Sequence, residues 1–147
     1  MAACSVIPGV SQRGPIETDA RAALEDAGLR AGVEAFDTGE GLANSYQLLI
    51  CAEVADADAR DATALAESLA EIFNAVHPVT VDFADHVSAV DVRLVRASAE
   101  AADFDEWCRD ESSYVPLDSA GELLAAPVSS GWDSVSLETP YEPVALS

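Results

Sequence analysis

The sequence predicts an α+β fold, a two-layer sandwich in which an antiparallel sheet carries helices on one face. Half of the 147 residues are hydrophobic, which is enough to bury a core. The chain has only two Trp, three Tyr and four Phe, so that core must be built mainly from aliphatic residues and alanine. The hydrophobic spacing also changes along the chain between helical and two-residue periods. The resulting order is αββαβ(β), followed by a C-terminal helix and an edge strand.

The N-terminal residues differ from the rest of the chain. Residues 1–16 include Pro8, Gly9, Gly14 and Pro15 and show no apolar period, which is typical of a flexible leader. Chains of this length usually form one folded unit. We therefore expect a leader over residues 1–16 and a single α+β domain over residues 17–147.

The first folded segment predicts a helix and then a β-hairpin. Thr18-Asp19 can cap a helix that Gly28 ends. A turn cluster at residues 37–41 then precedes a strand with alternating faces. The face expected to point into the core consists of Tyr46, Leu48, Ile50, Ala52 and Val54. The opposite face, which includes Leu49 and Cys51, is half apolar, so we expect another segment to cover part of it.

Residues 56–76 give the clearest helical pattern. From Leu65 onward, apolar residues follow at i+4, i+7, i+8 and i+11, and acidic residues gather at the N-terminal end, as the helix dipole favours. We expect His77-Pro78 to end this helix. Alternating residues over 79–84 and 90–95 then predict one long bent strand or two shorter ones.

After Ser98 the spacing of Phe104, Trp107 and Cys108 predicts a third helix, a candidate cover for the second face of the sheet.

The C-terminal region predicts one short helix and one strand. Ser119 and Glu122 have the spacing of a capping box for a helix through Ala126. The alternation from Trp132 to Leu137 predicts an edge strand, paired either within the monomer or across a dimer.

The charge of the chain limits its partners. There are 27 acidic and 7 basic residues, a net charge of -20, and all seven cations are arginines. Such a field repels nucleic acid and anionic membrane surfaces. We expect a cationic or neutral protein partner. Alanine richness and arginine without lysine indicate an actinobacterial protein or one from a high-salt cytoplasm.

No motif predicts an enzyme or a cofactor. The run Asp56 to Asp61 begins like a calcium loop but lacks the required Gly and the final Glu, so helix capping explains it. Asp82, Asp85 and His86 are the candidate metal or general-base residues, although no metal-binding spacing accompanies them.

The three cysteines raise the question of export. Ala2-Ala3-Cys4 has the form of the end of a bacterial lipobox, with an ordinary intracellular start as the alternative. If Cys4 carries a lipid, Cys51 and Cys108 remain as a candidate disulfide. Two buried reduced thiols are the other interpretation of that pair.

Over about residues 2–97 the chain resembles uncharacterised actinobacterial cell-envelope lipoproteins. The resemblance rests on Ala2-Ala3-Cys4, the Pro/Gly leader, the Ala-rich helix, the hairpin residues 33–36 and 41–50, and an amphipathic helix ending in Pro. It implies an extracytoplasmic location, a lipid on Cys4 as the only link to the membrane, and the α+β layout.

Three functional hypotheses follow. The first is a non-enzymatic, envelope-tethered binding or scaffolding protein. The second is an intracellular acidic accessory protein, in the cytoplasm, that binds a basic partner. The third is a small enzyme or metal protein that uses Asp82, Asp85 and His86.

Overall fold

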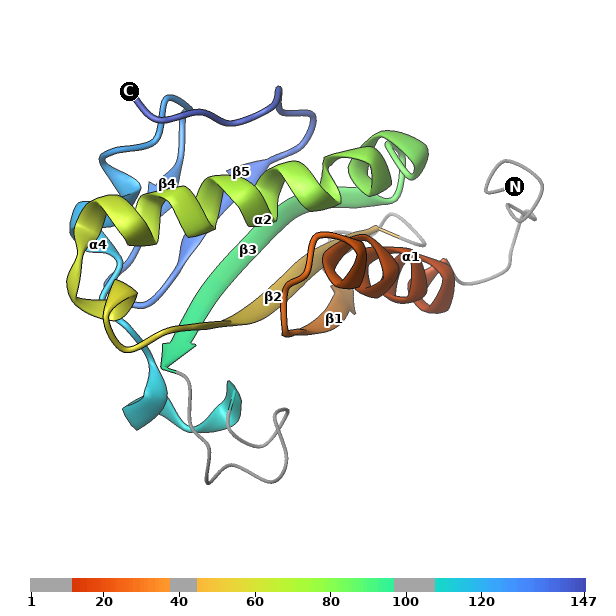
Figure 1. The fold of residues 1–147 in the computed structure, drawn as a ribbon. Coiled ribbons are helices and arrows are strands. Elements are labelled where there is room, and N and C mark those ends of the chain that lie inside the picture. Colours follow the sequence, from red (N-terminus) through yellow and green to blue (C-terminus); the bar gives the residue numbers. More distant parts are fainter. Residues whose placement is uncertain (1–11, 38–44, 97–107) are drawn as a thin grey trace.

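The computed structural model describes residues 12–37, 45–96 and 108–147, and its fold is α+β. The helices lie on one side of a five-stranded sheet, so the arrangement is a two-layer sandwich (Figure 1). Along the chain the elements are α1 (Arg13–Asp26), β1 (Ala31–Asp37), β2 (Tyr46–Val54), η2 (Asp58–Arg60), α2 (Ala62–Asp82), β3 (Val87–Arg96), η3 (Glu111–Ser113), α4 (Asp118–Gly121), β4 (Ser129–Ser130) and β5 (Val135–Glu138).

The sheet has the strand order β1-β2-β3-β5-β4, and one of its pairings departs from the prediction. β1 and β2 form the expected antiparallel hairpin, and β3–β5 and β5–β4 are also antiparallel. β2 and β3, however, are parallel. The reason is α2, which carries the chain back along the sheet between them, so that β3 starts at the same end as β2. The sheet is therefore mostly, and not wholly, antiparallel.

Helix α1 begins earlier than the sequence predicted. It starts at Arg13, within the expected leader, and Ile16 is fully buried. Pro15 is compatible with this start because the first turn of a helix has no intrahelical partner for its N–H groups. The predicted stop at Gly28 is confirmed: this glycine has φ 79° and donates its N–H to Glu25 O.

Helix α2 is displaced toward the C-terminus relative to the prediction. Asp61 caps it by accepting a hydrogen bond from the Thr63 N–H at 3.0 Å. The helix then continues through Pro78 to Asp82, so the strand predicted from residue 79 is wrong. Val79 and Phe83, which suggested strand alternation, are both buried and extend the helical apolar stripe by a further turn.

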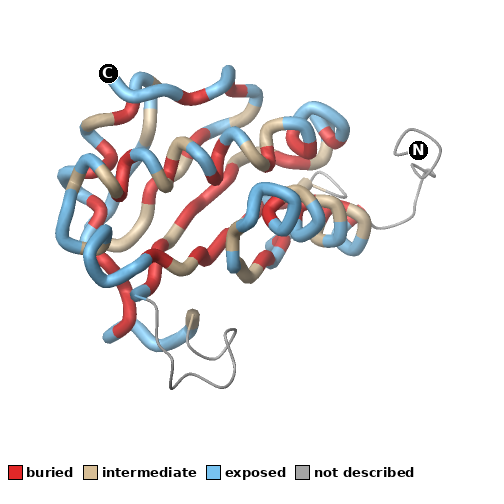
Figure 2. The backbone as a smooth tube through the Cα atoms, in the orientation of Figure 1, coloured by how far each residue is buried: buried red, intermediate tan, exposed pale blue. Residues whose placement is uncertain are grey.

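The core fills the space between the helices and one face of the sheet. The predicted inward residues of β2 are all buried, which confirms that face (Figure 2). They pack in one cluster with α1, with α2 and with the inward residues of β3, which are Val90, Val92 and Leu94. Within the described ranges, no helix is both long enough and apolar enough to cross a bilayer.

The C-terminal part of the chain differs from the prediction in its short helix and in the position of its strand. The helix α4 is only four residues long, its N-cap is Leu117, and no side chain caps it, so the predicted capping box does not form. The strand predicted at Trp132 to Leu137 is β5, which lies between β3 and β4 and is not an edge strand. The helix predicted around Phe104 and Trp107 lies outside the described residues.

The last residues of the chain are attached along α2, above the helix in Figure 1. The Asn74 side chain donates to Val144 O at 2.8 Å and accepts from Val144 N at 2.6 Å. His77 Nε2 lies 2.8 Å from Tyr141 O, and the buried Tyr141 hydroxyl donates to Phe73 O at 2.7 Å. These contacts hold the C-terminal segment on the helical layer.

The Tyr141 hydroxyl should make stability depend on alkaline pH. Burial raises the pKa of Tyr141 well above its usual range, so the folded protein keeps a proton that the unfolded chain releases near pH 10. The contribution of Tyr141 to the free energy of unfolding is therefore fully present below about pH 10 and is lost as the pH rises further. We expect the free energy of unfolding to drop by about 1 kcal/mol between pH 9 and pH 11. Urea titrations across this range measure it.

Tyr141→Phe is the matched variant for this effect. It should be less stable at neutral pH by about 1 kcal/mol, since the hydrogen bond to Phe73 is lost. Its unfolding free energy should vary less between pH 9 and pH 11 than that of the wild type. Parallel curves for the two proteins would show that Tyr141 does not cause the alkaline loss.

Candidate functional site

A pocket of about 470 Å³ lies at the face of the sheet that points away from α2. Its walls come from three parts of the chain. One wall is a side of α1 together with the strand β1. The floor consists of residues of β2 and β3 that point away from the core, among them Leu49 and Arg93. The remaining wall is the segment from Cys108 to Tyr114.

The α1 wall is held against the free edge of β1. Glu17 accepts a hydrogen bond from the Ala35 N–H at 2.8 Å, and Arg21 donates to Val33 O at 2.9 Å. Because β1 is an outer strand of the sheet, no strand among the described residues pairs with these backbone groups. Two side chains of α1 thus replace the missing strand, and both line the pocket.

Arg13 adds a cation to the same wall. Its guanidinium lies 3.6 Å from Glu17 Oε2 and 3.7 Å from Glu34 Oε1. About half of the Arg13 and Glu34 side chains is exposed, so each pair contributes little to stability. Their effect is on position: the two carboxylates and the guanidinium share one end of the pocket.

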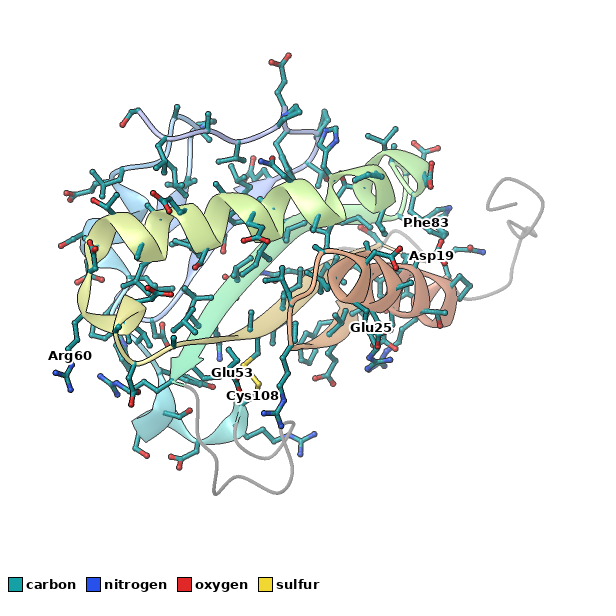
Figure 3. The ribbon with its side chains drawn as sticks, viewed as in Figure 1. Asp19, Glu25, Glu53, Arg60, Phe83 and Cys108 are labelled. Atoms are coloured by element: carbon teal, nitrogen blue, oxygen red, sulfur yellow. A yellow bond between two sulfur atoms is a disulfide. The ribbon has the colours of Figure 1, made fainter. Side chains whose placement is uncertain are left out.

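A disulfide joins Cys51 to Cys108 beneath β2, and the two Cα atoms are 6.1 Å apart (Figure 3). Cys51 lies on the outward face of β2, where the sequence analysis expected a covering segment. Val95 and Tyr114 pack against the bridge in a small second core. The disulfide therefore fixes the last wall of the pocket onto the sheet.

Arg93 connects this wall to the floor. It donates to the Tyr114 hydroxyl at 3.3 Å and stacks over the Tyr114 ring at 5.6 Å. The Tyr114 hydroxyl in turn donates to Cys108 O at 2.8 Å. Burial alone would lower the pKa of Arg93, but the contacts with Tyr114 and the nearby Asp91 and Asp133 outweigh it and raise the pKa, so the guanidinium stays charged.

Arg109 follows the disulfide directly and is exposed. Within the described part of the chain, its side chain makes no hydrogen bond or ion pair. The pocket is thus lined by four guanidiniums, those of Arg13, Arg21, Arg93 and Arg109. Among the described residues that line it, the acidic ones are Glu17 and Glu34. Asp91 is not part of the lining but lies 3.9 Å from Arg93 Nε, so four positive and three negative charges lie at or directly beside the pocket, in a chain of net charge -20.

The sequence did not indicate this cluster of arginines. Its members come from α1, from β3 and from the segment after the disulfide, and they are separated by up to 96 residues, from position 13 to position 109. No short motif contains two of them with a recognisable spacing. The one available signal was the pairing of Cys51 with Cys108, which would have placed Arg109 beside β2.

The predicted metal candidates lie elsewhere. Asp82 is the last residue of α2, and Asp85 and His86 follow in the turn before β3. In the described ranges no three His, Cys, Asp or Glu side chains come together in a way that could hold a metal ion. Cys4, the proposed lipid site, lies outside the described residues.

A scan against models of protein families found no match, and neither did searches of curated proteins and of solved structures.

Removing the Glu17 carboxylate tests the role of the α1 wall. Glu17→Ala leaves the Ala35 N–H without its partner, and we expect a loss of about 1–2 kcal/mol in the free energy of unfolding. Glu25→Ala is the control, because Glu25 is exposed on the same helix and its side chain makes no hydrogen bond or ion pair within the described residues. It should change stability by less than about 0.5 kcal/mol. Chemical denaturation of both variants measures the difference, and equal effects would contradict this role.

Proposed function

We propose that this chain is a non-enzymatic binding protein of the cell envelope, tethered through a lipid on Cys4, and that it binds its ligand in the pocket beside the disulfide. The observation that carries the proposal is the bridge between Cys51 and Cys108. Disulfides of this structural kind form and persist in oxidising compartments outside the cytoplasm. An extracytoplasmic location accounts for the bridge because such compartments supply the oxidant that two thiols need to form a disulfide.

The position of the bridge supports a binding role. It joins two outward-facing segments that are 57 residues apart, and it holds Arg109 and Tyr114 at the pocket wall. Removing it would release the Cys108 end of this wall, whereas the Tyr114 end is also held by the β-bridge to Val95 and by Arg93. A bridge in this position holds Arg109, the residue next to Cys108, beside the outward face of β2.

The chemistry of the pocket also favours binding over catalysis. Its described cations are arginines, which stay protonated near neutral pH and cannot act as general acids or bases there. Its two described carboxylates are engaged: both lie beside Arg13, and Glu17 also accepts the Ala35 N–H. Groups held in this way are suited to positioning a ligand.

The rest of the surface limits macromolecular partners. With a net charge of -20, the exterior would repel nucleic acid and anionic lipid, so the lipid on Cys4 would provide the only membrane contact. A protein partner docking outside the pocket would be cationic or neutral. An intracellular acidic accessory protein would also prefer a cationic or neutral partner. The location of the chain therefore decides between that alternative and the envelope protein proposed here.

Trapping thiols in intact cells tests the location. The gene, with its own upstream sequence, is expressed in its host, and free thiols are alkylated before lysis. We expect Cys51 and Cys108 to remain unmodified until a reductant is added, as seen by mass spectrometry of the peptides. Alkylation of both residues in intact cells would overturn export and favour the intracellular alternative.

Lipid attachment needs a separate measurement. Cells are fed an alkyne-labelled fatty acid, and the wild type is compared with Cys4→Ser. We expect label and membrane association in the wild type only. A disulfide-bonded but unlabelled protein in the medium would retain export and overturn the tether.

A further inference from the structure

We propose that the pocket binds a small amphipathic anion, an apolar body of roughly aromatic size that carries a carboxylate or phosphate group. This inference rests on the proposed binding function, but not on where in the cell the protein works. The overall charge of the chain suggests a cationic or neutral partner. The pocket favours an anion instead, because its lining is positively charged whereas the exterior is negatively charged.

The charge distribution is the first reason. Four of the seven arginines of the chain line this single pocket, whereas the described lining includes only two carboxylates. Bringing four like charges together opposes folding unless an anion or other interactions compensate. Arg13 is compensated by Glu17 and Glu34, and Arg93 by Tyr114 and Asp91. The remaining two, Arg21 and Arg109, have no described ion pair, so the pocket retains positive charge for a ligand.

The donors that remain are suited to an oxyanion. A guanidinium has five N–H groups in a planar fork that matches carboxylate and phosphate oxygens. Arg21 uses one of its terminal nitrogens for Val33 O, and Arg109 uses none within the described residues. Because Arg109 follows Cys108, the disulfide holds the backbone of this donor at the pocket.

The apolar part of the lining is the second reason. The side chain of Phe36 is 44% exposed although it lies on a strand, and Leu49, the disulfide and the ring of Tyr114 are further apolar surfaces of the same pocket. An inorganic ion would leave these surfaces in contact with water. A volume of about 470 Å³ lies within the range of sites for small organic ligands, so an apolar body would fit beside the arginines.

Binding of four probes to the purified, disulfide-bonded full chain tests the proposal. Isothermal titration calorimetry would compare 2-naphthoate, phenyl phosphate, inorganic phosphate and 1-naphthylmethylammonium. We expect saturable one-to-one binding of at least one of the two amphipathic anions, and the tighter of the two identifies the acidic group. Inorganic phosphate should bind at least about tenfold more weakly, and the cation should not bind. Equal affinity for the anion and the cation of similar body, or no binding of either amphipathic anion, would overturn the proposal.

Matched arginine variants locate the site. Arg109→Gln should weaken the better anion about tenfold, since a charge-assisted contact is lost. Arg60→Gln is the control, because Arg60 is also exposed and makes no side-chain hydrogen bond or ion pair within the described residues, yet lies outside the pocket lining. It should bind like the wild type. Equal losses in both variants would indicate a general charge effect and would overturn the assignment to this pocket.

Two further variants separate the charge from the apolar contact. Glu34→Gln removes a negative charge from the wall and should strengthen anion binding about threefold at low salt, whereas Glu25→Gln, outside the pocket, should not. Phe36→Ala should weaken 2-naphthoate or phenyl phosphate but not inorganic phosphate. Weaker binding in Glu34→Gln would contradict the electrostatic argument.

The outcomes separate this inference from the proposed function. Anion binding in vitro together with alkylated Cys51 and Cys108 in cells would retain the ligand class and overturn the envelope location. An exported, disulfide-bonded protein that binds none of the probes would overturn the ligand class alone.

Discussion

The packing of α2 across β2 and β3 is the interaction on which the rest of the structure depends. The buried stripe of this helix, from Leu65 to Phe83, covers the inward residues of both strands and forms the centre of the core. The same helix links the two strands, which makes them parallel. With one face of these strands covered in this way, their other face is left for the disulfide, the arginines and the pocket.

The edge strand β1 joins the core to the pocket. Its outer backbone groups would be an exposed template for pairing with another chain, and Glu17 and Arg21 bind two of them. Since these side chains also line the pocket, a substitution there would affect protection of the edge and the shape of the site together. Two hydrogen bonds thus hold α1 and β1 together at the pocket, and a wall that is already ordered loses less entropy when a ligand binds.

Local patterns in the sequence predicted much of the fold. The alternation from Tyr46 to Val54 assigned the buried face of β2 correctly, and Gly28 marked the end of α1. The prediction that Pro78 ends the helix was wrong. Proline lacks the N–H for one helical hydrogen bond, but the burial of Val79 and Phe83 favours continuing the helix past it. The parallel pairing was missed for a related reason: strand direction depends on how α2 returns over the sheet, and no residue pattern within a strand records it.

The pocket could not be predicted in the same way. Arg13 and Arg21 reach it through the docking of α1 on a strand edge, Arg93 through the register of β3, and Arg109 through a bridge formed by residues 57 positions apart. Each of these placements is a long-range result of folding. The net charge of the whole chain gave no indication of a positively charged pocket, because 27 acidic residues outnumber the four arginines that line it.

The contrast between this pocket and the exterior has a consequence for the size of a ligand. Charges on the surface act over about one Debye length, roughly 8–10 Å in ordinary salt, which is comparable to the dimensions of the pocket. A polyanion that entered the pocket with one group would hold its other groups over the acidic exterior, where they are repelled. A small anion lies wholly among the guanidiniums and avoids that repulsion. For the proposed anion ligand, the acidic surface therefore favours a compact molecule with one acidic group.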